Sequence, residues 1–449
     1  MSHLPATPLT DAVNGALPAA RADLERLVRI PSIWADPAHA DDTRRSAEAV
    51  ADLARGAGAA DVRVVAADGG APAVIAHFPG PEGTPTVLLY AHHDVQPTGG
   101  DDQWTTPPFE PSERDGRLYG RGAADDKAGV MAHLAVLRAF GGRPPVGVTL
   151  FIEGEEESGS PTLTALLREH HELLTCDVIV IADASNPAVD VPGLTTSLRG
   201  LVDVTIEVAM LEQPVHSGVY GGPVGDALTA LVHALASLHT PEGEVAVPGL
   251  VHGSSAAPDA TRPASAPTRA ARRRAAAGQR HRAGAGVAEA GRRGARDRRA
   301  ARRRRLERAA PPRPRGGQHA DRARRQHREG AARARRAPGG QRAVGARVTV
   351  TPGRGIAEPY SLESTGSVYD AARRTFTQAF GNPVVETGIG GSIPFIAEFA
   401  RVFPGATVLV TGVGDPASRW HGIDESLDLA MFARVVLAEA LLLADLAGS

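Results

Sequence analysis

Apolar and polar residues follow two different periods along the first 200 residues of the chain. Helical spacing covers residues 10–29, 42–58, 127–140 and 163–174. Between them lie short runs rich in valine, leucine and isoleucine, which are typical of buried strands. These runs are Asp61–Val65, Ala73–His77, Thr86–Tyr90, Val146–Ile152 and Asp177–Ala182. Strands that alternate with helices in this way predict an α/β sandwich around a largely parallel central sheet flanked by helices.

A second pattern begins near Gly200. Residues 201–210 alternate like a half-exposed strand, and residues 224–238 have the spacing of an amphipathic helix. The first pattern returns near Val344 and continues to the C-terminal helix. A chain of 449 residues is long enough for two domains. We therefore predict that a smaller α+β domain, residues 198–345, is inserted into a larger domain formed by residues 1–197 and 346–449.

Residues 261–343 lose all regular patterning. Proline aside, their only apolar residues larger than alanine are Val287 and Leu306, and 27 arginines stand against five acidic residues. Three interpretations are open: a basic arm that binds nucleic acid, a solvated linker, or a stretch translated out of frame. The third is favoured, because a shifted frame in GC-rich coding sequence yields mainly arginine, alanine, glycine and proline. We expect the stretch to be disordered and to disrupt the inserted domain.

The remaining composition indicates the cellular compartment and the class of partner. Its net charge is −2, which by itself favours neither nucleic acid nor a membrane surface as partner. The single cysteine, Cys176, excludes an internal disulfide and fits a reducing compartment. The N-terminal residues lack the pattern of a signal peptide, and no apolar run reaches the roughly 18–20 residues that span a bilayer. We expect a cytoplasmic protein with no membrane partner.

Residues that can bind metal ions follow several of the predicted strands or glycine-rich turns. Because the carboxyl ends of parallel strands meet at one edge of a sheet, we expect these side chains to lie together. Two imidazoles and three carboxylates suit zinc, manganese or cobalt. A pair of such ions can activate water and polarise a carbonyl group. The candidate ligands are His92, Asp125, Glu157, Asp183 and His421.

Two further carboxylates stand beside these ligands. Asp94 lies two residues beyond His92 and could accept the second N–H of its imidazole. Glu156 precedes Glu157 and could take a proton from an attacking water. Each motif alone also fits ordinary structure, such as a buried histidine, a helix cap or a solvated acidic loop. Only their order and context along the chain favour a metal site.

That order resembles a known family. The motifs are L-L-Y-A-H-H-D-V-Q-P, L-Y-G-R-G-A-A-D-D-K, I-E-G-E-E-E-S-G-S, H-S-G-V-Y-G-G and G-G-S-I-P. Together they resemble the di-zinc metallopeptidases that include aminoacylase, acetylornithine deacetylase, succinyl-diaminopimelate desuccinylase and carnosinase-like dipeptidases. W-T-T-P-P-F and the form H-S-G-V-Y-G-G are most similar to the dipeptidase branch. The resemblance covers residues 1–260 and 344–449.

The resemblance implies two zinc ions, a hydroxide that bridges them, and an inserted domain that acts as a lid and dimerises. It implies that Asp125 bridges the ions, that His92 and Asp183 complete one site, and that Glu157 and His421 complete the other. Glu156 would then be the general base and Asp94 would orient His92. His216 would stabilise an oxyanion in a neighbouring subunit, and the peptide bond between Asp125 and Asp126 would be cis. The substrate would be held by Gly390, Gly391 and Ser392.

The stretch 261–343 departs from the family, because it replaces strands, a helix and a substrate-binding arginine of the lid. We therefore expect a zinc-dependent dipeptidase with impaired turnover, and we do not expect the family's homodimer to form with this lid. An N-acyl-amino-acid deacylase or desuccinylase remains an alternative. A second alternative is a catalytically inactive scaffold that binds nucleic acid through the arginines, although nucleic acid is not the expected partner.

Overall fold

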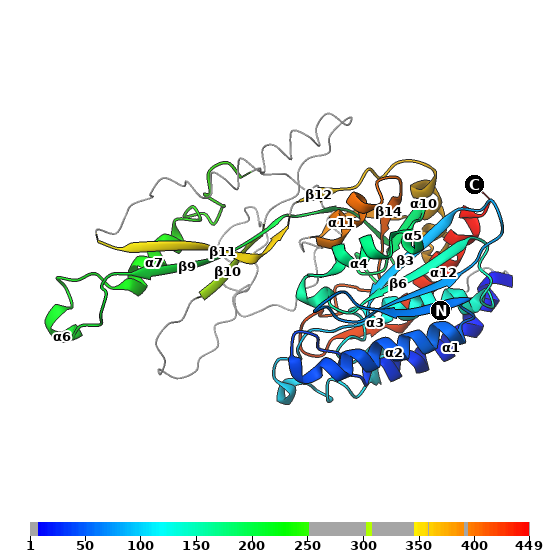
Figure 1. The fold of residues 1–449 in the computed structure, drawn as a ribbon, viewed down its shortest axis with the longest axis horizontal. Helices are drawn as coiled ribbons and strands as arrows, with labels where there is room; N and C mark the ends of the chain where they lie inside the picture. The colour runs from blue at the N-terminus through cyan, green and yellow to red at the C-terminus, as the bar shows by residue number, and fades with distance from the viewer. Residues whose placement is uncertain (1–7, 251–301, 308–344, 358, 390–393, 449) are drawn as a thin grey trace.

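A computed structural model describes residues 8–250, 302–307, 345–357, 359–389 and 394–448 (Figure 1). Its largest sheet has six strands in the order β1-β2-β6-β3-β7-β14. Four neighbours, β6, β3, β7 and β14, are parallel, whereas β1 and β2 are antiparallel to the strands they join. The bounds are β1 Asp61–Val65, β2 Ala73–Phe78, β3 Thr86–His92, β6 Gly147–Glu153, β7 Val178–Ile181 and β14 Thr407–Val410. The predicted largely parallel sheet is confirmed.

Helices cover both faces of this sheet because successive strand residues point to opposite sides. In β3, Val87 and Leu89 join one core cluster, and Leu88 and Tyr90 join the other. Each leucine buried in this way contributes about 1.5–3 kcal/mol to folding. The first cluster packs against α1 (Pro8–Val28), α2 (Ala40–Gly56), α3 (Lys127–Ala139), α10 (Ser367–Phe380) and α12 (Leu429–Leu446). The second packs against α4 (Leu163–Glu169), α5 (His171–Leu174) and α11 (Pro394–Val402).

Two buried polar contacts fix α3, which begins directly after the predicted ligand Asp125. The Lys127 ammonium donates to the carbonyls of Leu27 (2.8 Å) and Ile30 (2.7 Å), at and just beyond the C-terminal end of α1. Further along α3, Nδ1 of the fully buried His133 lies 2.9 Å from the Glu439 carboxylate of α12. These contacts hold the start of α3 against the rest of the larger domain.

Smaller sheets and turns complete the larger domain. One sheet has the order β12-β8-β13, and another has the order β15-β5-β4. The sequence pattern did not indicate these short strands, nor α11. The bounds are β4 Ser112–Arg114, β5 Arg117–Tyr119, β8 Gly193–Leu198, β12 Tyr360–Ser361, β13 Val385–Ile389 and β15 Ser426–Asp428, with 3-10 turns at η1 Pro37–His39, η2 Asp101–Gln103 and η3 Glu156–Ser158.

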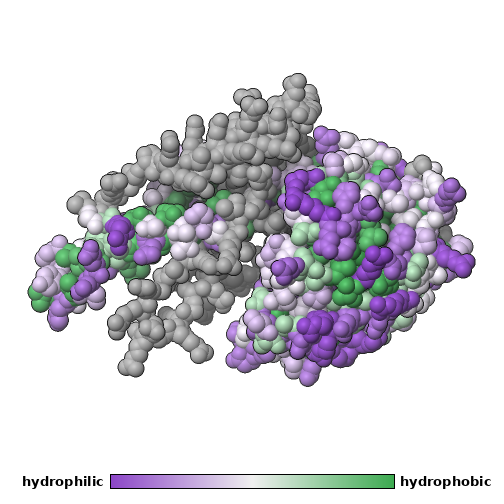
Figure 2. All heavy atoms as spheres, in the orientation of Figure 1, coloured by the Kyte–Doolittle hydropathy of each residue, from purple (hydrophilic) through white to green (hydrophobic). Residues whose placement is uncertain are grey.

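In the described part of the chain, the inserted domain consists of a thin sheet with the helices α6 and α7, and it extends away from this sandwich at the left of Figure 1. Its strands run in the order β10-β9-β11, and α7 packs on β9. No residue of α7 is buried, and apolar side chains lie on its surface (Figure 2). The elements are β9 Leu201–Ala209, α6 Ser217–Tyr220, α7 Ala227–Ala236, β10 Arg302–Glu307 and β11 Arg347–Ala357.

Two details differ from the sequence-based expectation. Residues 302–307 form β10, although we expected no regular structure between 261 and 343. The edge of β9 explains this, because a strand edge offers N–H and C=O groups to any extended backbone, whatever its side chains. Second, β11 stays paired with β9 as far as Ala357. The domain boundary predicted at residue 345 would therefore place β11 in the larger domain, although β11 belongs to the sheet of the inserted domain. The rest of 261–343 lies outside the described residues.

Candidate metal centre

Three neighbouring parallel strands deliver side chains to one edge of the large sheet. β3 ends at His92, β6 ends at Glu153 just before the acidic turn that holds Glu157, and Asp183 follows β7 by two residues. Asp125 precedes α3, and its peptide bond to Asp126 is cis, as the resemblance implied. His421 comes from the turn before β15, where its φ of 59° lies in the left-handed region. Segments about 300 residues apart in the chain thus meet at one place.

The five predicted ligands form two overlapping groups. Ligand atoms of His92, Asp125 and Asp183 lie within 4.8 Å of one another, and so do those of Asp125, Glu157 and His421. Asp125 belongs to both groups: its Oδ1 lies 3.3 Å from His92 Nε2, and its Oδ2 lies 3.0 Å from His421 Nε2. One carboxylate therefore faces two donor sets, each of which has the nitrogen and oxygen atoms that zinc, manganese or cobalt accept.

The His92 imidazole is oriented but incompletely satisfied. Its Nδ1 lies 3.1 Å from the Asp94 carbonyl oxygen and 3.3 Å from Asp94 Oδ1. Its Nε2 is buried and has no hydrogen-bond partner among the described residues, although Asp125 Oδ1 is nearby. A buried nitrogen without a partner costs free energy unless something else binds it. A metal ion held between His92 and Asp125 fits that position.

Electrostatics also favour cations at this site. Burial raises the pKa of Glu156 and that of Asp183 well above their ordinary values, and neighbouring carboxylates raise both further. Burial would lower the pKa of His421, but its contacts with Asp125 and Glu157 outweigh burial and raise the pKa to about 11. The carboxylates of the cluster thus outnumber its positively charged groups, and two divalent ions would offset most of this excess negative charge. Its carboxylates are Asp94, Asp125, Asp126, Glu156, Glu157 and Asp183.

The three consecutive glutamates have different surroundings, which the sequence alone could not distinguish. Glu155 is buried and accepts hydrogen bonds from the backbone of Thr162 (2.6 Å) and Ala71 (3.2 Å), so it holds the loop in place. Glu157 belongs to the second ligand group. Glu156 belongs to neither group, and its Oε2 lies 3.8 Å from His92 Nε2. Among the three glutamates, Glu156 is therefore the one that neither holds the loop nor belongs to a ligand group.

Asp94 has a second contact that sequence reasoning missed. Its Oδ1 accepts the backbone N–H of Glu156 and its Oδ2 that of Glu157, each at 3.1 Å. Gln96, two residues further along, donates from Nε2 to Glu157 Oε2 at 2.8 Å. The motif H-H-D-V-Q-P already shows these two polar side chains, Asp94 and Gln96, close to the candidate ligand His92 at the end of a strand. What the sequence could not show was that these neighbours contact the loop after β6.

Of the predicted substrate-binding residues, His216 is the one that the structure describes, and it does not join the site within one chain. His216 is the exposed N-cap of α6, which lies at the far end of the inserted domain from the large sheet (Figure 1). Its expected role in a neighbouring subunit stays a prediction. Gly390, Gly391 and Ser392 lie outside the described residues.

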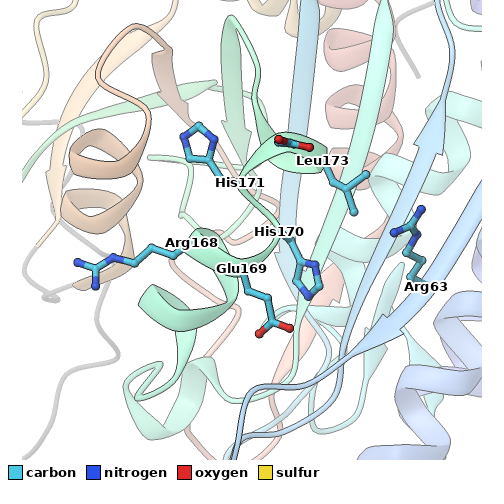
Figure 3. A pocket seen from close by; sticks show the side chains of 7 residues that line it. Arg63, Arg168, Glu169, His170, His171 and Leu173 are labelled. Atoms are coloured by element: carbon cyan, nitrogen blue, oxygen red, sulfur yellow. The ribbon is translucent and has the colours of Figure 1, made fainter.

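A separate surface hollow of about 490 Å³ shares no residue with the ligand groups. Two arginines and two glutamates line it, so their formal charges cancel. Figure 3 shows Arg63 and Arg168 on opposite sides of the turn between α4 and α5, so the two guanidinium groups do not converge on one point. This hollow has no arrangement that would select an anion, and the ligand groups remain the candidate site.

Comparison with known proteins assigns the family. The profile of peptidase family M20/M25/M40 matches residues 88–445, a range that contains all five predicted ligands. The chain belongs to peptidase family M20/M25/M40. It is thus a metal-dependent hydrolase, as the motifs predicted. Among the described residues, no helix is both long enough and apolar enough to cross a bilayer.

Several M20 relatives are dipeptidases. The cysteinylglycine-S-conjugate dipeptidase of Corynebacterium striatum is 32% identical over 375 residues, which cover 79% of this chain and 80% of that enzyme. The beta-Ala-His dipeptidase of mouse is 39% identical over 171 residues, but these cover only 37% of this chain and 35% of the mouse enzyme. The structure of human carnosine dipeptidase 1 superposes with a TM-score of 0.74 over 100% of both chains at 22% identity, which shows a common fold.

Proposed function

We propose that this M20 hydrolase is a dipeptidase that uses two zinc ions, with manganese or cobalt as possible substitutes. His92, Asp125 and Asp183 would hold one ion, and Asp125, Glu157 and His421 the other. The observation that carries the proposal is the position of Asp125, whose two oxygens face different ligand groups. The similarity to a cysteinylglycine-S-conjugate dipeptidase over 80% of that enzyme supports the substrate class.

The chain's own residues prepare the reaction. The bound ions would supply a lowered pKa for an attacking water and polarise the scissile carbonyl. Glu156 would take a proton from that water and pass it to the amine nitrogen as the C–N bond breaks, so that the water's oxygen ends on the carboxylate product. Asp94 keeps the His92 ring in place and also holds the backbone that carries Glu156. The base and the ligand are thereby fixed relative to each other.

We further propose that this chain binds metal well but turns substrate over slowly. Binding depends on the larger domain, where every proposed ligand lies on a packed element or a hydrogen-bonded turn. Turnover depends also on groups that hold the substrate, and His216 is exposed at the far tip of the inserted domain. Without a partner subunit that supplies such a group, the oxyanion formed during hydrolysis would lack a donor.

Metal content and substrate class can be tested together. The purified chain should bind two zinc ions per molecule, by atomic absorption, and lose its activity to a chelator. A panel of dipeptides and N-acyl amino acids should show hydrolysis of the dipeptides, slow but measurable. Preference for the N-acyl amino acids would point to a deacylase, and rapid dipeptide turnover would contradict impairment.

The role of Glu156 has its own test. Glu156→Ala should lower kcat by about 10²–10⁴-fold, the usual contribution of a general base, while two ions remain bound. Glu155→Ala is the matched control, because the Glu155 carboxylate accepts hydrogen bonds from Ala71 and Thr162 and belongs to neither ligand group. Its effect should appear mainly in thermal stability. Full turnover by E156A would contradict the assignment of Glu156 as the general base.

A further inference from the structure

One fully buried carboxylate near the ligands has no part in the proposed mechanism. Glu425 lies four residues beyond His421, at the start of the segment that forms β15, and has an exposure of 0%. Its side chain points into the turn before α3 rather than toward either ligand group. There it contacts the backbone of Asp125, the residue that both groups share.

Each oxygen of Glu425 has two hydrogen-bond donors. Oε1 accepts the backbone N–H groups of Ala124 (2.9 Å) and Asp125 (3.0 Å). Oε2 accepts the backbone N–H of Gly122 (3.2 Å) and the guanidinium of Arg121 (2.7 Å). All four donors lie within residues 121–125 of one turn, so a single carboxylate fixes the path of the backbone into Asp125. Only an acceptor at both oxygens satisfies this arrangement.

The turn needs such a fixed point because its backbone is not part of a helix or strand. Gly122 has a φ of +79°, and a Cβ there would come within 2.6 Å of Val95. Arg121 is also buried, and it donates to the carbonyl of Pro97 in the loop that follows His92. The Arg121–Glu425 pair therefore connects the loop after β3, the Asp125 turn and the segment that carries His421.

We propose that Glu425 is a positioning residue that sets the place of Asp125 relative to His421 and thereby determines metal affinity. The inference rests on the proposed function, because it takes Asp125 and His421 as ligands. Glu425 touches no metal ion in this scheme. It acts through the backbone of Asp125, in the way that outer groups around metal sites orient the ligands and tune affinity.

The test replaces the carboxylate with an amide of the same shape. In Glu425→Gln, one acceptor oxygen becomes an NH₂ group that faces two N–H donors, so that half of the contact is lost. Co²⁺ is titrated into the metal-free full-length chain, and its visible absorption reports both affinity and ligand geometry. We expect E425Q to weaken Co²⁺ binding by about 10–100-fold and to alter the spectrum.

Glu439→Gln is the matched control. Glu439 is also buried, at 2% exposure, and also pairs with a buried basic side chain, His133, but it contacts none of the ligands. We expect E439Q to lower the thermal midpoint while leaving Co²⁺ affinity and spectrum unchanged. If E425Q lowers the thermal midpoint in the same way and keeps the native Co²⁺ affinity and spectrum, Glu425 is only structural and the inference is overturned.

Should E425Q fail to fold, Glu425→Asp takes its place under the same criterion. Its carboxylate is too short to reach all four donors, so a folded E425D with native Co²⁺ binding would equally overturn the inference. The proposed function fails separately. A wild-type chain that binds two Co²⁺ ions but cleaves no dipeptide contradicts the substrate class and leaves the role of Glu425 standing.

Discussion

The helices α12 and α7 are built from similar residues but have opposite surroundings. Both are rich in alanine, leucine and valine, and both begin with an aspartate cap. Asp428 accepts the N–H of Met431 at 2.8 Å, and Asp226 that of Thr229 at 2.7 Å. Yet 11 residues of α12 are buried and none of α7 is. Local sequence thus specifies a helix, whereas the burial of that helix depends on neighbours supplied by distant parts of the chain.

The largest expected difference between the two regions is in stability. Leu442→Ala on α12 removes a side chain with 0% exposure and should lower the free energy of unfolding by about 2–5 kcal/mol. Leu228→Ala on α7 removes one that is 62% exposed and should change it by no more than about 0.5 kcal/mol. Urea unfolding followed by circular dichroism measures both.

Tryptophan fluorescence separates the domains in the same experiment, because Trp34, Trp104 and Trp420 all lie in the larger one. The L442A loss should appear in fluorescence and circular dichroism alike. A large loss of stability in L228A would contradict this expectation and would show that α7 is covered by a partner in solution.

A smaller, pH-dependent effect is expected from the buried pair beneath β3. Burial alone would lower the pKa of His133, but the Glu439 carboxylate and the Tyr90 carbonyl outweigh it and raise the pKa. The pair therefore stabilises the fold fully below the unfolded histidine pKa of about 6.5, and the contribution is lost as pH rises through the folded value. Glu439→Gln should cost about 1–3 kcal/mol at pH 6 and less at pH 9. Equal losses at both pH values would contradict this.

A still smaller effect is expected at the tip of the inserted domain. His216→Ala should change kcat/KM by no more than about twofold, the kinetic equivalent of about 0.5 kcal/mol, because the side chain is exposed and far from the ligand groups. Steady-state kinetics on a dipeptide measures it, beside Glu156→Ala. A loss of a hundredfold or more would instead show that the inserted domain reaches an active site in a partner subunit.

An equally small effect on stability should follow removal of the inserted domain. Its two ends are adjacent, because Leu198 of β8 pairs directly with Tyr360 of β12. Replacing residues 199–359 with Asn-Gly would join these strands as a hairpin. The fluorescence-monitored free energy of unfolding should then change by no more than about 0.5 kcal/mol, and two Co²⁺ ions should still bind. A collapse in stability would show that the larger domain needs the insertion.

Sequence patterns predicted the elements that are long and strongly apolar. The strands that end near His92 and Asp183 were visible as runs of valine, leucine and isoleucine, and the α/β architecture follows from them. Strands such as β8, with the sequence G-L-T-T-S-L, or the three-residue β15 are too short or too polar to show a period. They form because a neighbouring strand, remote in sequence, offers hydrogen bonds. The single helix expected over 163–174 is two, divided at His170.

The site was predictable as a set of residue types, but its supporting contacts were not. His421 reads as a surface histidine, and its side chain is in fact 56% exposed, yet its Nε2 lies 3.0 Å from Asp125. Glu425 reads as an ordinary acidic residue of a polar loop. Its partners lie about 300 positions earlier in the chain, and only the folded structure brings them within reach.

The contacts of Asp94 bear on how this site tolerates change. One carboxylate touches the His92 ring and also holds the amides of Glu156 and Glu157. The loss of most single proposed ligands would leave the other ligand group intact. A change at Asp94 would disturb one proposed ligand of each group together with Glu156, the proposed general base. No second substitution at one ligand could restore all three. We therefore expect one substitution at Asp94 to impair the whole site, whereas we expect the entire inserted domain to be dispensable for stability.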